Sequence, residues 1–367
     1  MDDTDKKLLA ALQRDVPVMF RPFEALGKSL GLGEAETLER VRRLKMERVV
    51  RQISAIFDTT SLGYESSLVA ARCEPSRLDA AAEKINAHPG VSHNYRREHE
   101  FNLWYTIAVS PSSRLGLART VAMLHERSGA RSTRLLPTLR LFKIGVELDL
   151  EGDGNKSGWL GQPALPTISV GRGVPTAPRV GKTVVTGYSH KNRKAVAPLN
   201  ELEIRFVREM QQDLPVESEP FVAVAGRLGV TVEELRRISD AMRAEGRLRR
   251  FGAVLRHREA GFGANGMGIW IARGGDAEIE AAGETMATFR AVTHCYRRPT
   301  YPDWPYNLFT MIHARSRGEC ESVVAAMARE TGIAERAVLY STHEYKKQRV
   351  EYFTEAEARW EAEASSQ

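Results

Sequence analysis

The chain has 367 residues, of which 42% are hydrophobic, and its formal net charge of +6 corresponds to a pI near 9.2. This length supports roughly two to four small domains, and because the sequence lacks a long apolar run we expect no membrane-spanning helix. The mild positive charge is compatible with DNA, RNA or a polyanionic small molecule and does not decide between them.

Cysteine usage and the start of the chain indicate a reducing compartment. Cys73, Cys295 and Cys320 are odd in number and have no CxxC spacing, which argues against a disulfide framework or a zinc knuckle. The acidic start, MDDTD, lacks the basic and apolar stretches of a signal peptide. We therefore expect a cytoplasmic protein.

Residues 1–60 predict a winged helix-turn-helix domain. In the first helix, Leu8, Leu9 and Leu12 fall on one face, and Pro17 ends the helix. The other elements expected here are helices at 22–30 and 34–47 and a wing strand at 49–57.

Residues 61–150 predict a ferredoxin-like βαββαβ domain. Its strands and helices are expected, in the order strand, helix, strand, strand, helix, strand, at 67–73, 76–87, 91–97, 101–109, 112–127 and 132–146. Both helices of such a domain cover one face of an antiparallel sheet, so its other face needs a different partner.

Residues 151–198 predict a flexible tether. Gly, Pro, Ser and Thr dominate this segment, and neither a helical nor a strand period persists in it. It cannot bury enough apolar surface to offset its ordering entropy. A tether of this kind would keep the flanking domains at a high effective concentration.

The remainder of the chain repeats the first part. A shift of 198 positions aligns Pro17 with Pro215, and a shift of 201 aligns His93 with His294. The repeat predicts a second helix-turn-helix domain at 199–258, a second ferredoxin-like domain at 259–355 and a C-terminal tail at 356–367. Strands and helices of the second ferredoxin-like domain are expected at 266–272, 276–288, 292–298, 306–314, 317–330 and 336–350.

The predicted fold class is therefore α+β, with two tandem copies of a winged helix-turn-helix domain followed by a ferredoxin-like βαββαβ domain. We expect the free sheet faces of the two copies to meet each other. The chain would then be an intramolecular pseudo-heterodimer, with further homodimerisation left open.

Polar and aromatic side chains concentrate on the second and third strands of each ferredoxin-like domain. The first copy reads VSHNYRREHEFNLWYT and the second reads VTHCYRRPTYPDWPYNLFTMIH. Strand alternation predicts that His93, Tyr95 and Arg97 share one face and that Arg96 lies on the other. The corresponding row of the second copy is His294, Tyr296 and Arg298.

Two interpretations of these rows compete. A histidine on a strand is more often part of the scaffold than a ligand, and duplication copies scaffold as well as site. The combination with paired Arg and with Trp104, Tyr301 and Trp304 favours a flat, anionic ligand, because aromatic walls and Arg suit one. Further candidates, which fit a rim or core position as well, are His99, His313 and His343.

Several enzyme classes lack their sequence signatures in this chain. It has no HExxH motif, Walker loop, GxGxxG motif or nucleophile elbow, so nucleotide chemistry and hydrolysis have no local support. We also expect no metal site built from protein ligands alone.

The order of helix-turn-helix and βαββαβ resembles the Lrp/AsnC family of bacterial regulators over nearly the whole chain except the tether. DKKLL at 5–9 and ERVRRLKMERVVRQISAIFD at 39–58 are typical of that family. PVMFRPF at 17–23, PVESEPF at 215–221 and the long motifs of the two rows depart from it. They resemble the siroheme decarboxylases, which are the AhbA/AhbB and NirD/NirL-type proteins. The first copy is similar to NirD-like and the second to NirL-like proteins, as in a fused NirDL type.

The resemblance implies loss of carbon dioxide from two acetate side chains of siroheme, giving 12,18-didecarboxysiroheme in heme d1 or alternative heme biosynthesis. No added cofactor is implied, because the iron tetrapyrrole is the substrate. Our hypothesis is that four catalytic residues divide iron ligation or orientation from proton delivery, with His93 or His294 as the iron ligand: His93, Tyr95, His294 and Tyr296. The substrate-binding candidates are Arg96, Arg97, His99, Trp104, Arg297, Arg298, Trp304, Asn307 and His313.

A DNA-binding regulator of the Lrp/AsnC type is the alternative. The third helices, 34–47 and 232–245, could lie in a major groove, and the cations that could meet phosphates are Arg40, Arg42, Arg43, Arg236 and Arg237. The two helices differ in sequence, which weakens the two-fold symmetry that a palindrome needs, so nucleic acid is not the favoured partner. A structural dimerisation protein with vestigial sites is a third possibility.

Overall fold

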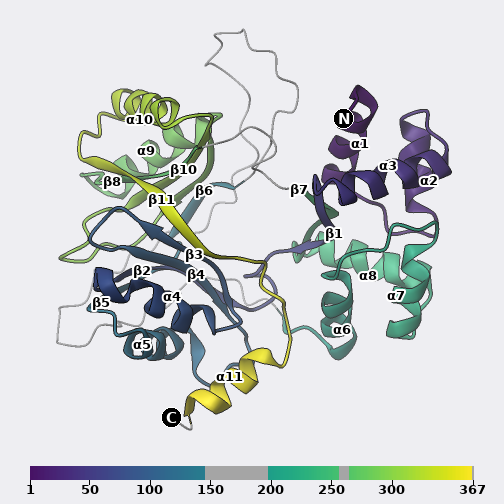
Figure 1. Cartoon of the computed structure of the whole chain (residues 1–367), viewed down its shortest axis with the longest axis horizontal. Coiled ribbons are helices and arrows are strands. Elements are labelled where there is room, and N and C mark those ends of the chain that lie inside the picture. Colours follow the sequence, from purple (N-terminus) through teal and green to yellow (C-terminus); the bar gives the residue numbers. More distant parts are fainter. Residues whose placement is uncertain (145–196, 256–263, 366–367) are drawn as a thin grey trace. The chain divides into compact units, whose positions relative to one another are not determined.

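The structure is a computed structural model that describes residues 1–144, 197–255 and 264–365. The predicted tether lies outside the described residues except at its last two positions. The chain divides into two compact units (Figure 1). Unit 1 comprises Met1–Glu65, Ala195–Ala260 and Glu351–Ala356, and unit 2 comprises Ser66–Lys194, Gly261–Val350 and Glu357–Gln367.

Unit 1 contains both helix-turn-helix copies. The first copy consists of α1 (Asp3–Arg14), α2 (Pro22–Ser29), α3 (Glu34–Met46) and β1 (Val50–Phe57). The second consists of α6 (Glu201–Met210), α7 (Pro220–Leu228), α8 (Val232–Ala244) and β7 (Leu248–Leu255). The same local signals start equivalent helices: α1 and α6 begin with capping boxes, and α2 and α7 begin with a proline.

The predicted wing strand pairs with the other copy. β1 and β7 form an antiparallel ribbon in which Ala55 lies opposite Phe251. Beside this ribbon the backbone bonds are reciprocal: Val16 N–H donates to Phe251 O and Leu214 N–H donates to Ile53 O, both at 2.7 Å. The two copies are therefore joined through their backbones into one body.

Two equivalent ion pairs extend this joint. Lys45 of α3 pairs with Asp213 at 2.7 Å, and Arg243 of α8 pairs with Asp15 at 2.6 Å. The repeat relates each residue of the first pair to one of the second, so unit 1 has an internal two-fold relationship at the level of individual side chains.

Unit 2 contains both βαββαβ domains, as the sequence predicts. The first has β2 (Glu65–Arg72), the short 3-10 helix η1 (Pro75–Arg77), α4 (Leu78–Asn86), β3 (Val91–Arg97), β4 (Leu103–Val109), α5 (Gly116–Ser128), β5 (Ser132–Leu136) and β6 (Arg140–Ile144). The second has β8 (Ala264–Trp270), α9 (Asp276–Thr288), β9 (Val292–Arg297), β10 (Leu308–Ala314), α10 (Arg317–Thr331) and β11 (Arg336–Lys347). Across the described ranges of the chain, no helix is both long and apolar enough to cross a membrane.

The two domains exchange their last strands. The described strands of unit 2 form one sheet in the order β5-β2-β4-β3-β11-β8-β10-β9-β6. β11 pairs with β8 through Arg336–Tyr340 and then with β3 of the other domain through Ser341–Lys347. The strand expected at 132–146 is interrupted after Leu136: β5 pairs with β2, and β6 pairs with β9. Pro137 lies at this interruption and has no N–H for a ladder bond.

Three cores follow from this arrangement. α4 and α5 cover the outer face of the first half of the sheet, and α9 and α10 cover the outer face of the second half. The inner faces of the two halves meet in a cluster that includes Trp104, Met267, Trp304, Phe309 and Leu339. The expectation that the free faces meet each other is therefore confirmed.

A helix lies in the segment that was predicted to be a C-terminal tail, 356–367. α11 (Ala356–Ser365) buries Trp360 and Ala364 in the outer core of the first domain. The Trp360 ring lies 4.4 Å from that of His88, and Arg127 lies over its face. Periodicity did not predict this helix because the apolar side of α11 is narrow and its partners, His88 and Arg127, are more than two hundred positions away.

Candidate functional site

The two His-Tyr-Arg rows face the inner cluster of unit 2. On β3, Tyr95 lies opposite Trp104, and on β9, Tyr296 lies opposite Phe309. Trp104 and Phe309 both belong to the inner cluster. The alternation predicted for both strands is therefore observed, and the rows of the two domains are equivalent.

A hydroxyl group orients each histidine. His93 Nδ1 lies 3.0 Å from Ser92 Oγ, and His294 Nδ1 lies 2.9 Å from Thr293 Oγ1. The imidazole and phenol rings of a row lie side by side, with centroids 6.1 Å apart in the first domain and 6.0 Å apart in the second. Each row thus presents two groups that can carry a proton, an imidazole and a phenol, in one orientation.

Arg97 and Arg298 end the rows and join the two domains. Arg97 Nη1 donates to Leu339 O at 2.7 Å, and Arg298 donates in the same way to Leu136 O. Each carbonyl belongs to the other domain. The guanidinium groups are buried and lie over their own tyrosines, Arg97 at 5.7 Å and Arg298 at 4.6 Å from the ring centroid. Burial lowers the pKa of both to about 10, which leaves them charged at neutral pH.

The segment PTYPDWP, which only the second domain has, packs against the first domain. Trp304 is fully buried, with its ring 5.4 Å from that of Phe101. Asp303 accepts two hydrogen bonds from Arg134, at 2.8 and 2.6 Å, and Tyr301 donates its hydroxyl to Leu135 O at 2.6 Å. The Trp304 Nε1 donor has no partner within the residues that the structure describes.

The other predicted binding residues have different surroundings. His99 Nδ1 accepts from Phe101 N–H at 3.0 Å, and burial lowers the pKa of His99. The Asn307 amide bonds both backbone groups of Ala272 at 2.9 Å, which is a scaffold contact that Asn102 repeats in the first domain. His313 lies on β10 opposite Asn265, two residues beyond Met311, and Met311 is the residue opposite His294, so His313 lies at the His294 end of the row.

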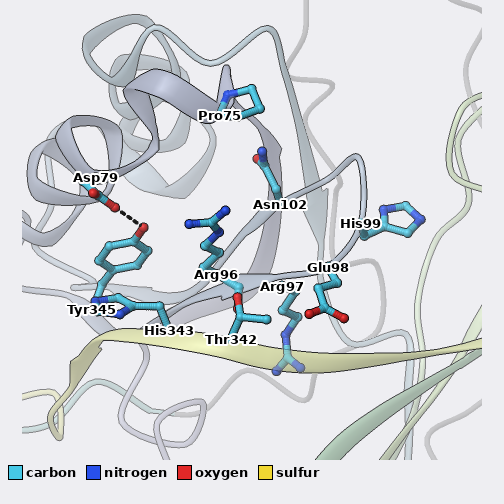
Figure 2. A pocket seen from close by; sticks show the side chains of 10 residues that line it. All are labelled: Pro75, Asp79, Arg96, Arg97, Glu98, His99, Asn102, Thr342, His343 and Tyr345. Carbon is cyan, nitrogen blue, oxygen red and sulfur yellow. Dashed lines mark hydrogen bonds between the residues drawn. The ribbon is translucent and has the colours of Figure 1, made fainter.

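Arg96 and Arg297 point to the outer side of the sheet and are separated from the rows. Arg297 pairs with Asp276 at 2.5 Å. Arg96 enters a cavity of about 610 Å³ (Figure 2). The cavity is lined by Pro75, Asp79, Arg96, Arg97, Glu98, His99, Asn102, Thr342, His343 and Tyr345. His343 and Tyr345 reach it on β11 of the second domain, which is why spacing within one domain did not predict the cavity.

No group of three or more His, Cys, Asp or Glu side chains that could hold a metal ion occurs among the described positions. The three cysteines are buried free thiols. Burial raises the pKa of Cys73 to about 11 and that of Cys295 to about 12, so neither is a thiolate at neutral pH.

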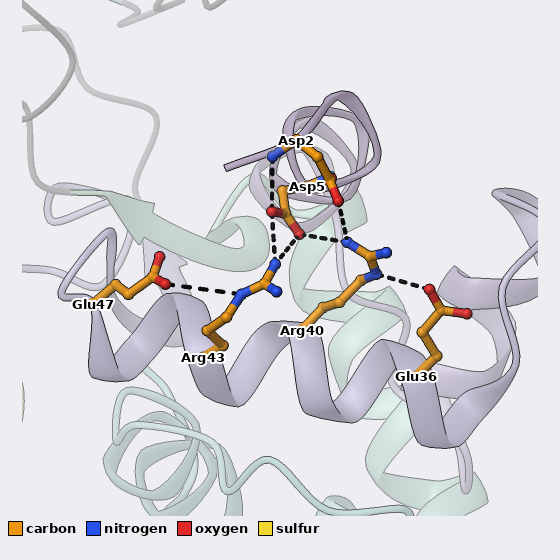
Figure 3. Close-up of polar contacts among 6 residues, drawn as sticks. All are labelled: Asp2, Asp5, Glu36, Arg40, Arg43 and Glu47. Carbon is orange, nitrogen blue, oxygen red and sulfur yellow. Dashed lines mark hydrogen bonds and ion pairs between the residues drawn. The ribbon is translucent and has the colours of Figure 1, made fainter.

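Cations of the third helix in the first copy are used inside unit 1. Asp5 is buried and accepts from Arg40 Nη1 at 3.0 Å and from Arg43 Nη2 at 2.7 Å (Figure 3). Arg42 donates to Val216 O at 2.8 Å. In the second copy, Arg236 pairs with neighbours on its own helix. These contacts compete with binding to phosphates.

Family models match both copies of each domain. The model described as AsnC-like ligand binding domain matches residues 61–143 and 259–346. The model described as siroheme decarboxylase NirDL-like HTH domain matches residues 5–51 and 203–249.

Individual proteins give the same result. A siroheme decarboxylase of Hydrogenobacter thermophilus is 37% identical over 354 residues, which is 96% of each chain. The siroheme decarboxylase alpha subunit of Desulfovibrio desulfuricans is 40% identical over 155 residues, 42% of this chain and 87% of the subunit. A crystal structure of siroheme decarboxylase NirDL in complex with an iron-uroporphyrin III analogue matches with a TM-score of 0.73 at 31% identity, covering 99% of both chains. One helix-turn-helix domain and the ferredoxin-like domain that follows it in the sequence are called a module. Because these matches span both modules, the chain belongs to the siroheme decarboxylase family.

Proposed function

We propose that this chain is a carboxy-lyase that converts siroheme to 12,18-didecarboxysiroheme by removing carbon dioxide from two acetate side chains. The observation that carries the proposal is the similarity to a siroheme decarboxylase over 96% of both chains. The two equivalent His-Tyr rows on the inner face of unit 2 supply groups that this reaction needs.

Each decarboxylation requires a proton donor and no redox partner. The bond between the methylene carbon and the carboxylate carbon breaks, carbon dioxide leaves, and the electron pair stays on the methylene carbon in conjugation with the macrocycle. A proton from an acid then forms the new C–H bond of the methyl group. Since every electron is accounted for, the reaction needs no added cofactor.

The four row residues are the proposed catalytic groups. His93 or His294 would ligate or orient the substrate iron, and a histidine or tyrosine of the rows would donate the proton. Ser92 and Thr293 support this division, because a ring held by a hydroxyl at Nδ1 has one orientation. Buried Arg97 and Arg298 would add positive charge beside the tyrosines, where an anionic substrate is stabilised.

The fused chain would act as an intramolecular pseudo-heterodimer. The alpha subunit of D. desulfuricans corresponds to about one module, since it matches 42% of this chain. β11 pairs with β3 and β6 pairs with β9, so the ferredoxin-like domains of the two modules share one sheet in unit 2.

Turnover by the purified full-length protein tests the proposal. Siroheme is incubated with the protein under anaerobic conditions, and the tetrapyrrole is analysed by chromatography and mass spectrometry. The expected product has lost two carbon dioxides. Recovery of unchanged siroheme with active reference enzyme in a parallel reaction would refute the proposal.

A further inference from the structure

The outer Arg of each row has a different environment in the two modules. In the second module, Arg297 pairs with Asp276 at the start of α9. Its cross-strand neighbour on β6, Arg140, pairs with Glu280 and Glu284 of the same helix. Both cations are therefore compensated by acids of the helix that covers them.

The first module keeps acids at two of these positions, Asp79 for Glu280 and Glu83 for Glu284, and has lost the acid that pairs with the outer Arg. The repeat aligns α4 with α9 at a shift of 201, which puts Pro75 at the position of Asp276. On β11, His343 lies opposite Arg96 as Arg140 lies opposite Arg297. The exposed Arg96 guanidinium has no hydrogen bond or ion pair within the described part of the chain.

A second difference accompanies the cavity. In the second module, the Phe142 ring lies directly on α9, because a Cβ at Gly283 would be 2.4 Å from it. The first module has Ala82 at the equivalent position and Tyr345 in place of Phe142. The methyl group of Ala82 would overlap a ring placed as Phe142 is, so Tyr345 cannot pack on the helix in the same way. The Tyr345 hydroxyl instead donates to Asp79 at 2.5 Å.

Most of the other polar groups lining the cavity have partners already. The Asp79 carboxylate accepts a hydrogen bond from Tyr345, as Figure 2 shows. Burial, and to a smaller extent this hydrogen bond, raises the pKa of Tyr345 to about 12. The Asn102 amide is used by Cys73. Arg97 lines the cavity but donates to Leu339 O. Arg96, with His343 beside it, is therefore the cation left to recognise a ligand.

We propose that this cavity of the first module binds a carboxylate through Arg96. A guanidinium presents two parallel N–H donors that match a carboxylate, and a cavity of about 610 Å³ lies within the range of small-molecule sites. The exposed carboxylate of Glu98 at the rim repels an anion, so the affinity of the site for a carboxylate is lower than Arg96 alone would give. The carboxylate has two sources: a free small organic acid, or an acid side chain of the tetrapyrrole, in which case the inference rests on the proposed function.

Binding to the full-length protein is measured by calorimetry with two probes, succinate and iron-uroporphyrin III. Arg96→Gln removes the charge, and Pro75→Asp rebuilds the acid partner of the second module. Arg140→Gln is the matched control, since Arg140 has the position in the second module that His343 has in the first and is already paired with Glu280 and Glu284. We expect Arg96→Gln and Pro75→Asp to lower the affinity for the probe that binds by about tenfold or more, with Arg140→Gln close to wild type. Circular dichroism identifies a variant that does not fold, in which case the other variant decides.

The pattern of losses distinguishes the sources. If the two test variants lose succinate binding and keep iron-uroporphyrin binding, the site takes a free acid. If the test variants bind iron-uroporphyrin more weakly and the wild type does not bind succinate, the site takes an acid side chain of the tetrapyrrole. The inference is overturned if neither probe binds the wild type, if the two test variants bind both probes normally, or if Arg140→Gln weakens binding as much as Arg96→Gln. None of these readouts requires turnover, so failure of the proposed activity is seen separately.

Discussion

Trp304 of the second module lies edge-on against Trp104 of the first, with ring centroids 5.2 Å apart and an angle of 61° between the rings. Both side chains are almost completely buried. Trp304 comes from the PTYPDWP segment, which the first module lacks, so the centre of the pseudo-dimer is built from an asymmetric insertion. The divergence of the two copies at this point therefore has a packing consequence inside unit 2.

Truncation of Trp304 should destabilise unit 2 strongly. Trp304→Ala removes a buried ring that contacts both modules and leaves a cavity, for which the expected loss is about 3–5 kcal/mol of unfolding free energy. Urea denaturation followed by far-ultraviolet circular dichroism measures it. Trp304→Phe keeps much of the apolar contact and should lose clearly less. A loss below about 1 kcal/mol for the alanine variant would show that the ring is not part of a tight core.

Replacement of the row histidines should separate their roles. His93→Ala and His294→Ala should each lower the decarboxylation rate by about 10²–10⁴-fold if the missing group delivers a proton. If one histidine instead ligates the substrate iron, its replacement by Ala should change the absorption spectrum of bound siroheme. Product formation is followed chromatographically under anaerobic conditions. Full rates in both single variants and in the double variant would exclude both histidines from catalysis.

Glu357 should make the docking of α11 dependent on pH. Its carboxylate accepts from Ser110 N–H at 3.1 and 3.0 Å. Burial raises the pKa of Glu357 to about 7, against the bonds from Ser110 and with help from the charge of Glu361. A folded-state pKa above the unfolded value means that the stabilisation is complete below about pH 4.5 and is lost as the pH rises through 7.

The matched variants for this prediction are on one helix. Glu357→Gln keeps an acceptor for Ser110 but cannot ionise, so its melting temperature should fall less than that of the wild type between pH 5 and about 8. Glu363→Gln, at an exposed position of α11, should follow the wild type. If the melting temperatures of Glu357→Gln and wild type fall by the same amount across this pH range, the assigned pKa is contradicted.

Asp5 should be a strong determinant of stability in unit 1. Its buried carboxylate accepts from Arg40, Arg43 and the backbone N–H of Asp2. Asp5→Asn keeps the shape but removes the charge, and the expected loss is about 1–3 kcal/mol, because hydrogen bonds to charged groups are replaced. Urea denaturation of the full-length protein provides the value. The exposed Asp3→Asn is the control and should change stability little.

Paired cations on α3 predict weak binding to DNA. Arg40, Arg43 and Lys45 would have to leave their acidic partners to neutralise phosphates. We therefore expect a logarithmic salt slope smaller than about 2 in fluorescence anisotropy with duplex DNA, whereas a protein with six to ten phosphate contacts shows a much steeper one. A steep slope with preference for one sequence would instead support a regulator.

Periodicity predicted the elements that depend on neighbouring residues. β3 and α9 begin and end at or near the expected positions, and His93, Tyr95 and Arg97 share a face because alternation is a property of any strand. The same alternation separated Arg96 from the row. It could not assign Asn307, whose amide could serve a ligand or a backbone, and the structure shows contacts to Ala272.

Other features depend on contacts between distant segments. The exchange of β6 and β11, the docking of α11 and the cavity around Arg96 each join residues that are more than a hundred positions apart. Hydrophobic patterns identify a buried face but do not identify its partner. For this reason, the wing strand was predicted correctly as a strand, but its pairing with β7 was not predicted.

The sequence alone determined that one module occurs twice and that the copies differ in the segment between the His-Tyr-Arg strand and the next strand of each copy. Repetition and insertion are properties of the linear chain. Only the tertiary structure decided that the inserted Trp304 packs between the two modules and that Arg97 and Arg298 bind carbonyls of the opposite module. It also decided that, among the described residues, the Arg96 guanidinium has no acidic partner where Pro75 stands in place of Asp276. The physical reason is that a charge or an aromatic ring acquires its energy from what surrounds it, and folding brings those surroundings from the other copy.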